Sequence, residues 1–278
     1  MTPDDSDSKM NSIKLFNIFY ILNKFDYICV MKNFVTYNEK YFLGDIHGEW
    51  SVILKHLDKV TDFDFRERHR VCYIQVGDFG IGYNKIESEM AKLLILNEHL
   101  AEKESDLFIL RGNHDDPQWF IQDQFVEHKE KLTNIFFVPD YTVLNIDLEN
   151  ILFIGGAVSI DRNWTKFRGG KYWPDEVVKF DFEAITNLRD IDRLVCHTAP
   201  DFVEPLGFNQ LVYNFALNDD LLLEDLRTER GNMNKLVTEL MKNNNLKEFI
   251  YGHFHGTYKF RHNDCDFNGL NINQFHRC

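Results

Sequence analysis

The chain has 278 residues, 44% of them hydrophobic, and carries a formal net charge of −13 at pH 7. A chain of this length and composition can bury one large core. Because an acidic surface repels phosphate backbones and anionic lipids, we expect no stable binding to nucleic acid or to a membrane. An acidic protein still binds anionic ligands where bound metal ions supply positive charge.

The first thirty residues form an apolar but interrupted segment. The acidic stretch TPDDSDS precedes the apolar run, and Lys24 and Asp26 break it. These features match neither a secretory signal nor a membrane span. We therefore treat residues 1–30 as an N-terminal extension, either an added surface helix or a segment before a natural start at Met31. The remainder, 31–278, is predicted to be a single domain.

The cysteines indicate a reducing compartment. There are five, widely spaced, with no Cys-x-x-Cys pair among them. Such a pattern is typical of a cytoplasmic protein with free thiols. Cys72 and Cys196 lie within apolar runs and are expected to pack in the core.

Hydrophobic periodicity predicts strands and helices that alternate along most of the chain. Strands are expected at 40–43, 70–76, 106–110, 192–197 and 248–255, with a β-rich run at 134–156. Helices are expected at 49–60, 85–103, from Pro117 onward, near 181–189 and within 217–243. The stretch 159–180 shows little periodicity, and the C-terminus resembles a strand or hairpin. This order favours an α/β fold with much parallel pairing.

Polar residues suited to metal binding follow five of the expected strands. They occur in the motifs Gly44-Asp45-Ile46-His47-Gly48, Gly77-Asp78, Arg111-Gly112-Asn113-His114-Asp115, His197-Thr198 and Gly252-His253-Phe254-His255-Gly256. In open α/β sheets, functional residues gather beyond the carboxyl ends of the strands.

The composition of these motifs restricts the metal. Residues two apart in an extended chain point to the same side, so Asp45 and His47 would share a face, as would His253 and His255. Oxygen and nitrogen ligands without sulfur suit Mn, Fe, Zn or Ni rather than a structural cysteine-bound zinc. A single Gly-Asp pair often marks only a turn, but five such motifs together predict a metal site.

The order of these motifs resembles that of the calcineurin-like metallophosphoesterase superfamily. The family pattern D-x-H, G-D, G-N-H-[ED], a lone His and G-H-x-H is matched in order between residues 41 and 256. The resemblance implies an α/β sandwich of two mixed β-sheets flanked by α-helices. It also implies a dinuclear metal-dependent phosphoesterase, which hydrolyses a phosphate ester by attack of a metal-bridging hydroxide.

The resemblance assigns a role to each motif residue. Two sets would each hold one divalent cation: Asp45, His47 and His255 for the first, and Asn113, His197 and His253 for the second. Asp78 would bridge the two cations. His114 would protonate the leaving oxygen, and Asp115 would orient its imidazole. Manganese is the expected metal, with Fe, Zn or Ni as alternatives.

The substrate-binding residues are less clearly marked. Protein Ser/Thr phosphatases of the superfamily have a phosphate-binding Arg soon after the bridging Asp, whereas this chain has Phe79-Gly80-Ile81-Gly82-Tyr83. Arg111 matches another phosphate-contacting position of that branch. The basic and aromatic stretch 155–176 resembles a segment of some bacterial and phage members, and it contributes Arg162 and Arg168 as candidates. The alternative for Arg111 is a surface residue at the end of a strand. The alternative for the stretch 155–176 is a loop whose aromatic rings cap the core and whose charges are solvated.

These observations rank three functions. The first is a phosphomonoesterase that acts on a small phosphorylated molecule or a phosphoprotein. The second is a phosphodiesterase of nucleotides or nucleic acid, which the aromatic and basic stretch keeps open. The third is a degenerate binding scaffold, which the complete set of expected ligands disfavours.

Overall fold

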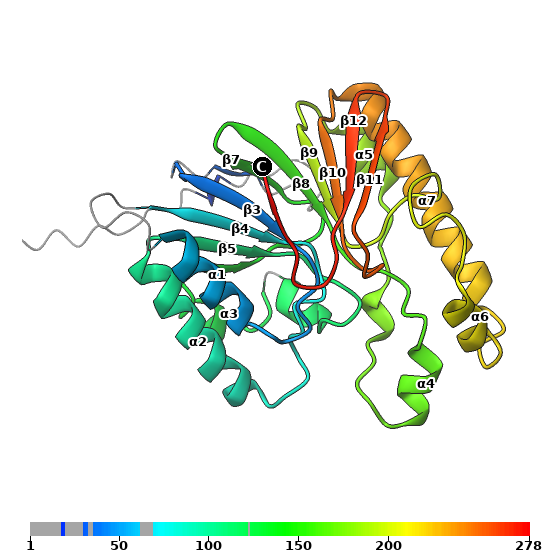
Figure 1. Ribbon diagram of the computed structural model, residues 1–278, viewed down its shortest axis with the longest axis horizontal. Coiled ribbons are helices and arrows are strands. Elements are labelled where there is room, and N and C mark those ends of the chain that lie inside the picture. The colour runs from blue at the N-terminus through cyan, green and yellow to red at the C-terminus, as the bar shows by residue number, and fades with distance from the viewer. Residues whose placement is uncertain (1–17, 20–29, 33–35, 62–68, 122) are drawn as a thin grey trace, which may run out of the picture.

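A computed structural model describes residues 18–19, 30–32, 36–61, 69–121 and 123–278. Two β-sheets pack face to face, and helices cover both outer surfaces (Figure 1). The predicted sandwich of two mixed sheets flanked by helices is confirmed.

The first sheet has five strands, and four of them are parallel. Its strands are, in spatial order, β13 (Phe275–Arg277), β3 (Glu39–Leu43), β4 (Val71–Gln75), β5 (Asp106–Ile109) and β6 (Ile135–Phe137). Only the edge strand β13 is antiparallel to its neighbour. Helices α1 (Ser51–Thr61) and α2 (Ile86–Glu102) connect successive parallel strands, so the carboxyl ends of β3, β4 and β5 lie at one edge.

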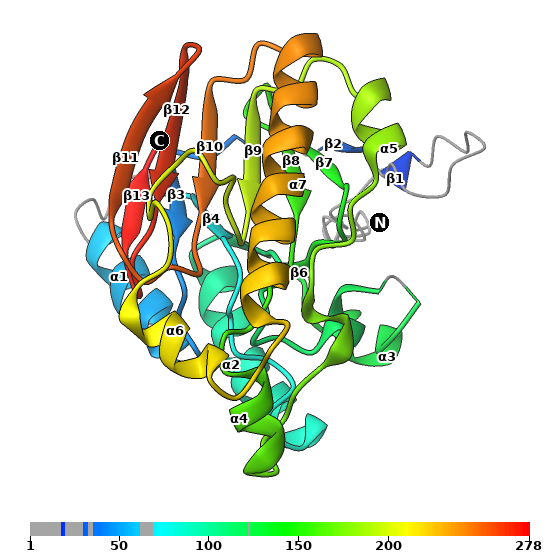
Figure 2. The ribbon, with the colours of Figure 1, turned by 90° about the vertical axis from the view of Figure 1, so that its right-hand side faces the viewer.

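The second sheet has eight strands and a parallel centre. In spatial order they are β1 (Ile18–Phe19), β2 (Val30–Lys32), β7 (Val143–Ile146), β8 (Glu149–Ile154), β9 (Arg193–Cys196), β10 (Glu248–Tyr251), β12 (Cys265–Gly269) and β11 (Tyr258–His262). The run β8–β9–β10–β12 is parallel. Helices α5 (Phe182–Asn187) and α7 (Leu222–Asn243) lie against its outer face (Figure 2).

The core follows from the period-two alternation of the strands. Phe42, Ile74 and Phe108 of the five-stranded sheet point inward and meet residues such as Phe153 and Ile250 of the other sheet. Their neighbours along the chain point outward and pack beneath the helices. Because both faces of each central strand are buried, these strands are apolar almost throughout.

Two expected elements differ from those observed. The helix expected from Pro117 is a four-residue 3₁₀ helix, η1 (Pro117–Phe120), in which the Asp116 carboxylate accepts from the Gln118 N–H. The stretch 159–180 contains α4 (Arg162–Phe167) and η2 (Pro174–Glu176). Helix α4 is too short for periodicity to reveal, and side-chain contacts hold it, including a bond from Thr165 Oγ1 to Asp161. Two other short helices are α3 (Val126–Lys129) and α6 (Gln210–Ala216).

The N-terminal segment lies mostly outside the described residues. Its described parts, β1 and residue 30 of β2, are strands rather than the surface helix considered from sequence. The single domain over 31–278 stays a prediction. Within the described chain, no helix combines the length and apolar character needed to cross a membrane.

The inter-sheet core predicts a large difference between two equivalent substitutions. Phe153 is 0% exposed between the sheets, whereas Phe167 is 84% exposed on α4. Phe153→Ala should lower the free energy of unfolding by about 3–5 kcal/mol through lost burial and a cavity. Phe167→Ala should change it by less than about 0.5 kcal/mol. Guanidinium chloride unfolding measures both, and similar values for the two variants would contradict this core assignment.

Candidate metal centre

The expected ligands come together where the strand ends of the two sheets meet. The loops after β3, β4 and β5 approach those after β9 and β10 at this edge (Figure 1). Residues that lie more than 200 positions apart are in contact there: His47 Nε2 lies 3.1 Å from His255 Nε2. The fold therefore assembles the motifs as the sequence predicts.

A first group consists of Asp45, His47, Asp78 and His255. One potential ligand atom from each residue lies within 4.8 Å of all the others. The two carboxylates are buried and the two imidazoles are exposed, so the group opens to solvent on one side. His255 Nε2 also lies 3.1 Å from Asp45 Oδ2.

A second group lies on the other side of Asp78. His197 Nε2 is 3.0 Å from Asn113 Oδ1 and 3.1 Å from Asp78 Oδ1. The ring of His253 lies beside it, with 5.1 Å between the ring centroids. His197 Nδ1 lies 2.9 Å from the Val76 carbonyl, and an Nδ1–H that donates there leaves Nε2 free to bind a metal.

The Asp78 carboxylate faces both groups. Oδ1 lies close to His197, and Oδ2 lies 4.0 Å from His47 Nδ1. The His114 backbone N–H donates to Oδ1 at 2.8 Å, which fixes the carboxylate. Gly112 makes this approach possible, because a Cβ there would lie 2.1 Å from Oδ1.

The backbone presents these ligands in an unexpected conformation. His47, Asp78, His253 and His255 all have positive φ, between 45° and 68°. Strand β10 ends at Tyr251, so His253 and His255 lie beyond it. The expectation that strand alternation sets these pairs on one side was wrong, since left-handed turns direct them instead. Such non-glycine turns cost energy and are concentrated at functional sites.

The donor set fits divalent cations. The buried Asp45 and Asp78 carboxylates lie 3.1 Å from the Nε2 atoms of His255 and His197, where a bound cation would compensate their charge. Burial lowers the pKa of His197, but the adjacent Asp78 carboxylate outweighs it and raises the pKa to about 9. The hydrogen bond to Asp45 likewise raises the pKa of His255. At these two histidines the raised pKa favours a proton where a cation would bind, whereas burial lowers the pKa of His47.

His114 lies beside this centre, but its ring partner is not the expected one. Its Nδ1 is 3.1 Å from the Tyr83 hydroxyl. The Asp115 carboxylate instead accepts hydrogen bonds from the backbone N–H groups of Phe79, Gly80, Ile81 and Gly112. The prediction that Asp115 orients the imidazole is corrected: it ties together the loops after β4 and β5.

The candidate arginines are mostly engaged within the protein. Arg111 is buried, and its terminal nitrogens donate to the Asp140 carboxylate and to four backbone carbonyls. Arg162 pairs with Asp219 and Asp225. Arg111 therefore has a structural role in this fold, while substrate contact by Arg162 stays a prediction. Arg168 is exposed, with its guanidinium 5.2 Å from the Trp164 ring, and its substrate role stays a prediction.

Sequence reasoning missed the residues that support the site. Ser159 Oγ accepts from Asn113 Nδ2 at 2.9 Å. The Lys171 ammonium donates to the Gly82 carbonyl, and the Trp173 ring lies 5.2 Å from that of Tyr83. All lie in the stretch 155–176 or the run after Asp78, which were notable by composition. Their partners are distant in sequence, so composition could not assign their roles.

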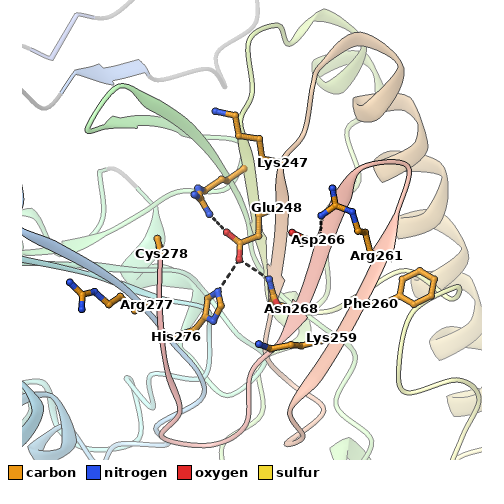
Figure 3. A pocket seen from close by; sticks show the side chains of 11 residues that line it. Lys247, Glu248, Lys259, Phe260, Arg261, Asp266, Asn268, His276, Arg277 and Cys278 are labelled. Atoms are coloured by element: carbon orange, nitrogen blue, oxygen red, sulfur yellow. Dashed lines mark hydrogen bonds and ion pairs between the residues drawn. The ribbon is translucent and has the colours of Figure 1, made fainter.

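A cavity of about 600 Å³ lies at the opposite ends of the strands (Figure 3). Glu248, at the start of β10, accepts there from Asn268 Nδ2 and lies 2.9 Å from His276 Nε2. Four of the five Lys and Arg side chains that line the cavity, Arg193, Lys247, Arg261 and Arg277, are paired with carboxylates, and the fifth is Lys259. We assign it no part in the chemistry.

A solvent-open cluster of carboxylates, imidazoles and an amide that can ligate divalent cations suits the attack of water on a phosphate ester. The protein is a metal-dependent phosphoester hydrolase. It belongs to the calcineurin-like phosphoesterase family, whose model matches residues 41–257.

The similar solved structures and the search of curated proteins do not narrow the activity beyond this family. Similar solved structures include TT1561 of Thermus thermophilus (11% identity, 87% of this chain and 99% of that chain, TM-score 0.46). A phosphopantetheinyl hydrolase from Mycobacterium tuberculosis is 13% identical (84% and 90%, TM-score 0.37). A cold-active protein-tyrosine phosphatase from a Shewanella species is 15% identical (86% and 72%, TM-score 0.33). No protein of curated function matches the sequence.

The raised pKa of His197 predicts that metal binding releases protons. At pH 7 the metal-free imidazole, with a pKa of about 9, is protonated, and a cation must displace that proton. Affinity for Mn²⁺ should therefore rise as the pH increases from 7 towards 9 and then level off. Calorimetric titration in two buffers of different ionisation enthalpy measures the release. A binding heat independent of the buffer at pH 7 would contradict the prediction.

Proposed function

We propose that the protein is a phosphomonoesterase that uses two divalent cations, with manganese as the native metal. The carrying observation is the position of Asp78, whose two carboxylate oxygens face separate sets of ligands. Asp45, His47 and His255 would hold one cation, and Asn113, His197 and His253 the other. One shared carboxylate between two opposed sets supports a two-cation centre better than a single-cation site.

The bound cations would lower the pKa of a water molecule and neutralise charge on the phosphoryl group. The chain itself supplies the acid. The His114 ring is half-buried, 5.7 Å from that of His47, and its backbone is fixed to Asp78. A Tyr83 hydroxyl that donates to Nδ1 leaves the proton on Nε2, from which His114 can deliver it to the leaving oxygen.

The proposed substrate is a small phosphorylated molecule or a phosphoprotein. Substrate contacts beyond the cations would come from the segment 159–176, whose Lys171 and Trp173 touch the loop after Asp78. Helix α4 in this segment projects from the end of the molecule where β9 and β10 finish (Figures 1 and 2). Arg168 provides the exposed cation for a second anionic group of the substrate.

Nucleotide phosphodiesterase activity is the second candidate. One observation favours it: Trp164 is 52% exposed, and Arg168 lies over its ring. An exposed aromatic ring beside a cation can stack a base and bind its phosphate. The net charge of −13 opposes long nucleic acids.

We infer a cytoplasmic location from the thiols. The four described cysteines, at positions 72, 196, 265 and 278, are free. Free thiols support a reducing compartment, and no stable partner among nucleic acids or membranes is proposed.

Two substitutions should separate metal binding from acid catalysis. Asp78→Asn removes the shared negative charge and should reduce the metal content from about two ions per chain to less than one. His114→Asn should retain both ions while kcat falls by about 10²–10⁴-fold, since only proton delivery is lost. Elemental analysis and steady-state kinetics measure the two effects. Full activity with fewer than two ions per chain would refute the two-cation proposal.

The substrate class can be decided with a pair of aryl esters. The Mn²⁺-loaded protein should hydrolyse para-nitrophenyl phosphate with a higher kcat/KM than its bis-ester. Preference for the bis-ester would favour the diesterase instead.

A second experiment tests the role of Arg168. For a substrate with a second anionic group, Arg168→Ala should raise KM several-fold and leave kcat unchanged. Arg189→Ala, which alters another exposed arginine, is the matched control.

A further inference from the structure

The side chain of Asn113 must be oriented correctly for the second cation. Its Oδ1 points towards His197 Nε2, and its Nδ2 points away towards Ser159. Only the amide oxygen can ligate a cation, because the NH₂ group carries hydrogens and no available lone pair. A flipped amide would therefore direct donors at the cation and leave the second set incomplete.

The hydrogen bonds behind Asn113 determine this orientation. The Ser159 backbone N–H donates to Glu176 Oε1 at 3.0 Å, and the Ser159 hydroxyl oxygen lies 2.9 Å from Asn113 Nδ2. With the Asn113 NH₂ group directed at Ser159, the hydroxyl oxygen accepts its hydrogen bond and Oδ1 is left facing His197. Asn113, Ser159 and Glu176 are each at most 3% exposed, so water does not compete readily for these bonds.

The segment that contains Ser159 and Glu176 is fixed to the segment that contains Asn113. Arg111 Nη1 donates to the carbonyls of Asp175 and Glu176, at 3.0 and 2.8 Å. Gly156 admits the guanidinium: its φ is +93°, and a Cβ there would lie 2.7 Å from Nη1. Arg111, two residues before Asn113, therefore holds both ends of the hydrogen-bonded chain in register.

We propose that Ser159 and Glu176 are positioning residues that orient the Asn113 amide and thereby set the affinity of the second cation. This proposal rests on the two-cation function and extends it to residues that touch neither cation nor substrate. The proposal also explains the Gly-Gly-Ala-x-Ser run at residues 155–159. Its glycines leave room for Arg111, and its serine orients Asn113.

The test is calorimetric titration of the metal-free protein with Mn²⁺ alone. Ser159→Ala should weaken the binding of one of the two Mn²⁺ ions by about 10–100-fold. This is the usual effect of removing a ligand's hydrogen-bond partner. The other ion should keep its affinity, because its ligands Asp45, His47 and His255 do not depend on Ser159. Ser159→Thr, which keeps the hydroxyl, should recover the weakened affinity. Thermal unfolding of the metal-free variants checks that both fold.

The possible results are distinguishable. A Ser159→Ala protein that binds both ions with wild-type affinity, or loses affinity for both equally, would overturn the positioning role while leaving the two-cation function intact. A wild-type protein that binds a single Mn²⁺ ion would refute the two-cation function, and this proposal with it. Selective loss in Ser159→Ala and its recovery in Ser159→Thr would establish the proposal.

Discussion

The rest of the site depends on the buried negative charge of Asp78. An unpaired carboxylate in the interior costs several kcal/mol, so the surrounding structure must supply positive groups. The five-stranded sheet contributes the His114 N–H and His47, and the eight-stranded sheet contributes His197. Burial raises the pKa of Asp78, but His197 and its neighbours outweigh this and hold the pKa well below its ordinary value. The two sheets thus meet at one shared anion.

Asp115 is a second buried carboxylate with a different task. Burial, with a smaller contribution from Asp78, raises its pKa to about 6, while hydrogen bonds from the backbone lower it. Its four N–H partners come from the loops after β4 and β5. The Asp115 carboxylate therefore binds the loops to each other, and the Asp78 carboxylate is left to face the proposed cations. Asp78 and Asp115 are similarly buried, but Asp78 faces imidazoles and Asp115 faces backbone N–H groups. These partners determine their different roles.

The sequence predicted what is local and missed what depends on distant partners. The seven expected ligands lie in short motifs after apolar strands. Parallel pairing aligns these motifs within each sheet, and the packing of the two sheets brings the two sets together. The role of Arg111 could not be read from its motif, because its acceptors lie between residues 140 and 177. The left-handed turns at His253 and His255 were also missed. A non-glycine residue adopts this conformation only where the surrounding structure holds it, so the local sequence does not mark its position.

The segment 155–177 contacts two parts of the site: a proposed metal ligand and the loop next to His114. Through Ser159 it reaches a proposed metal ligand, and through Lys171 and Trp173 it contacts the Gly82–Tyr83 loop next to His114. The loop after Asp78 lacks the arginine found there in protein Ser/Thr phosphatases, and this segment supplies the basic side chains proposed to contact substrate. A change that reshapes it for a new substrate would also move Ser159 or Tyr83. Substrate preference and metal affinity should therefore be coupled in this protein, because one stretch of backbone supports both.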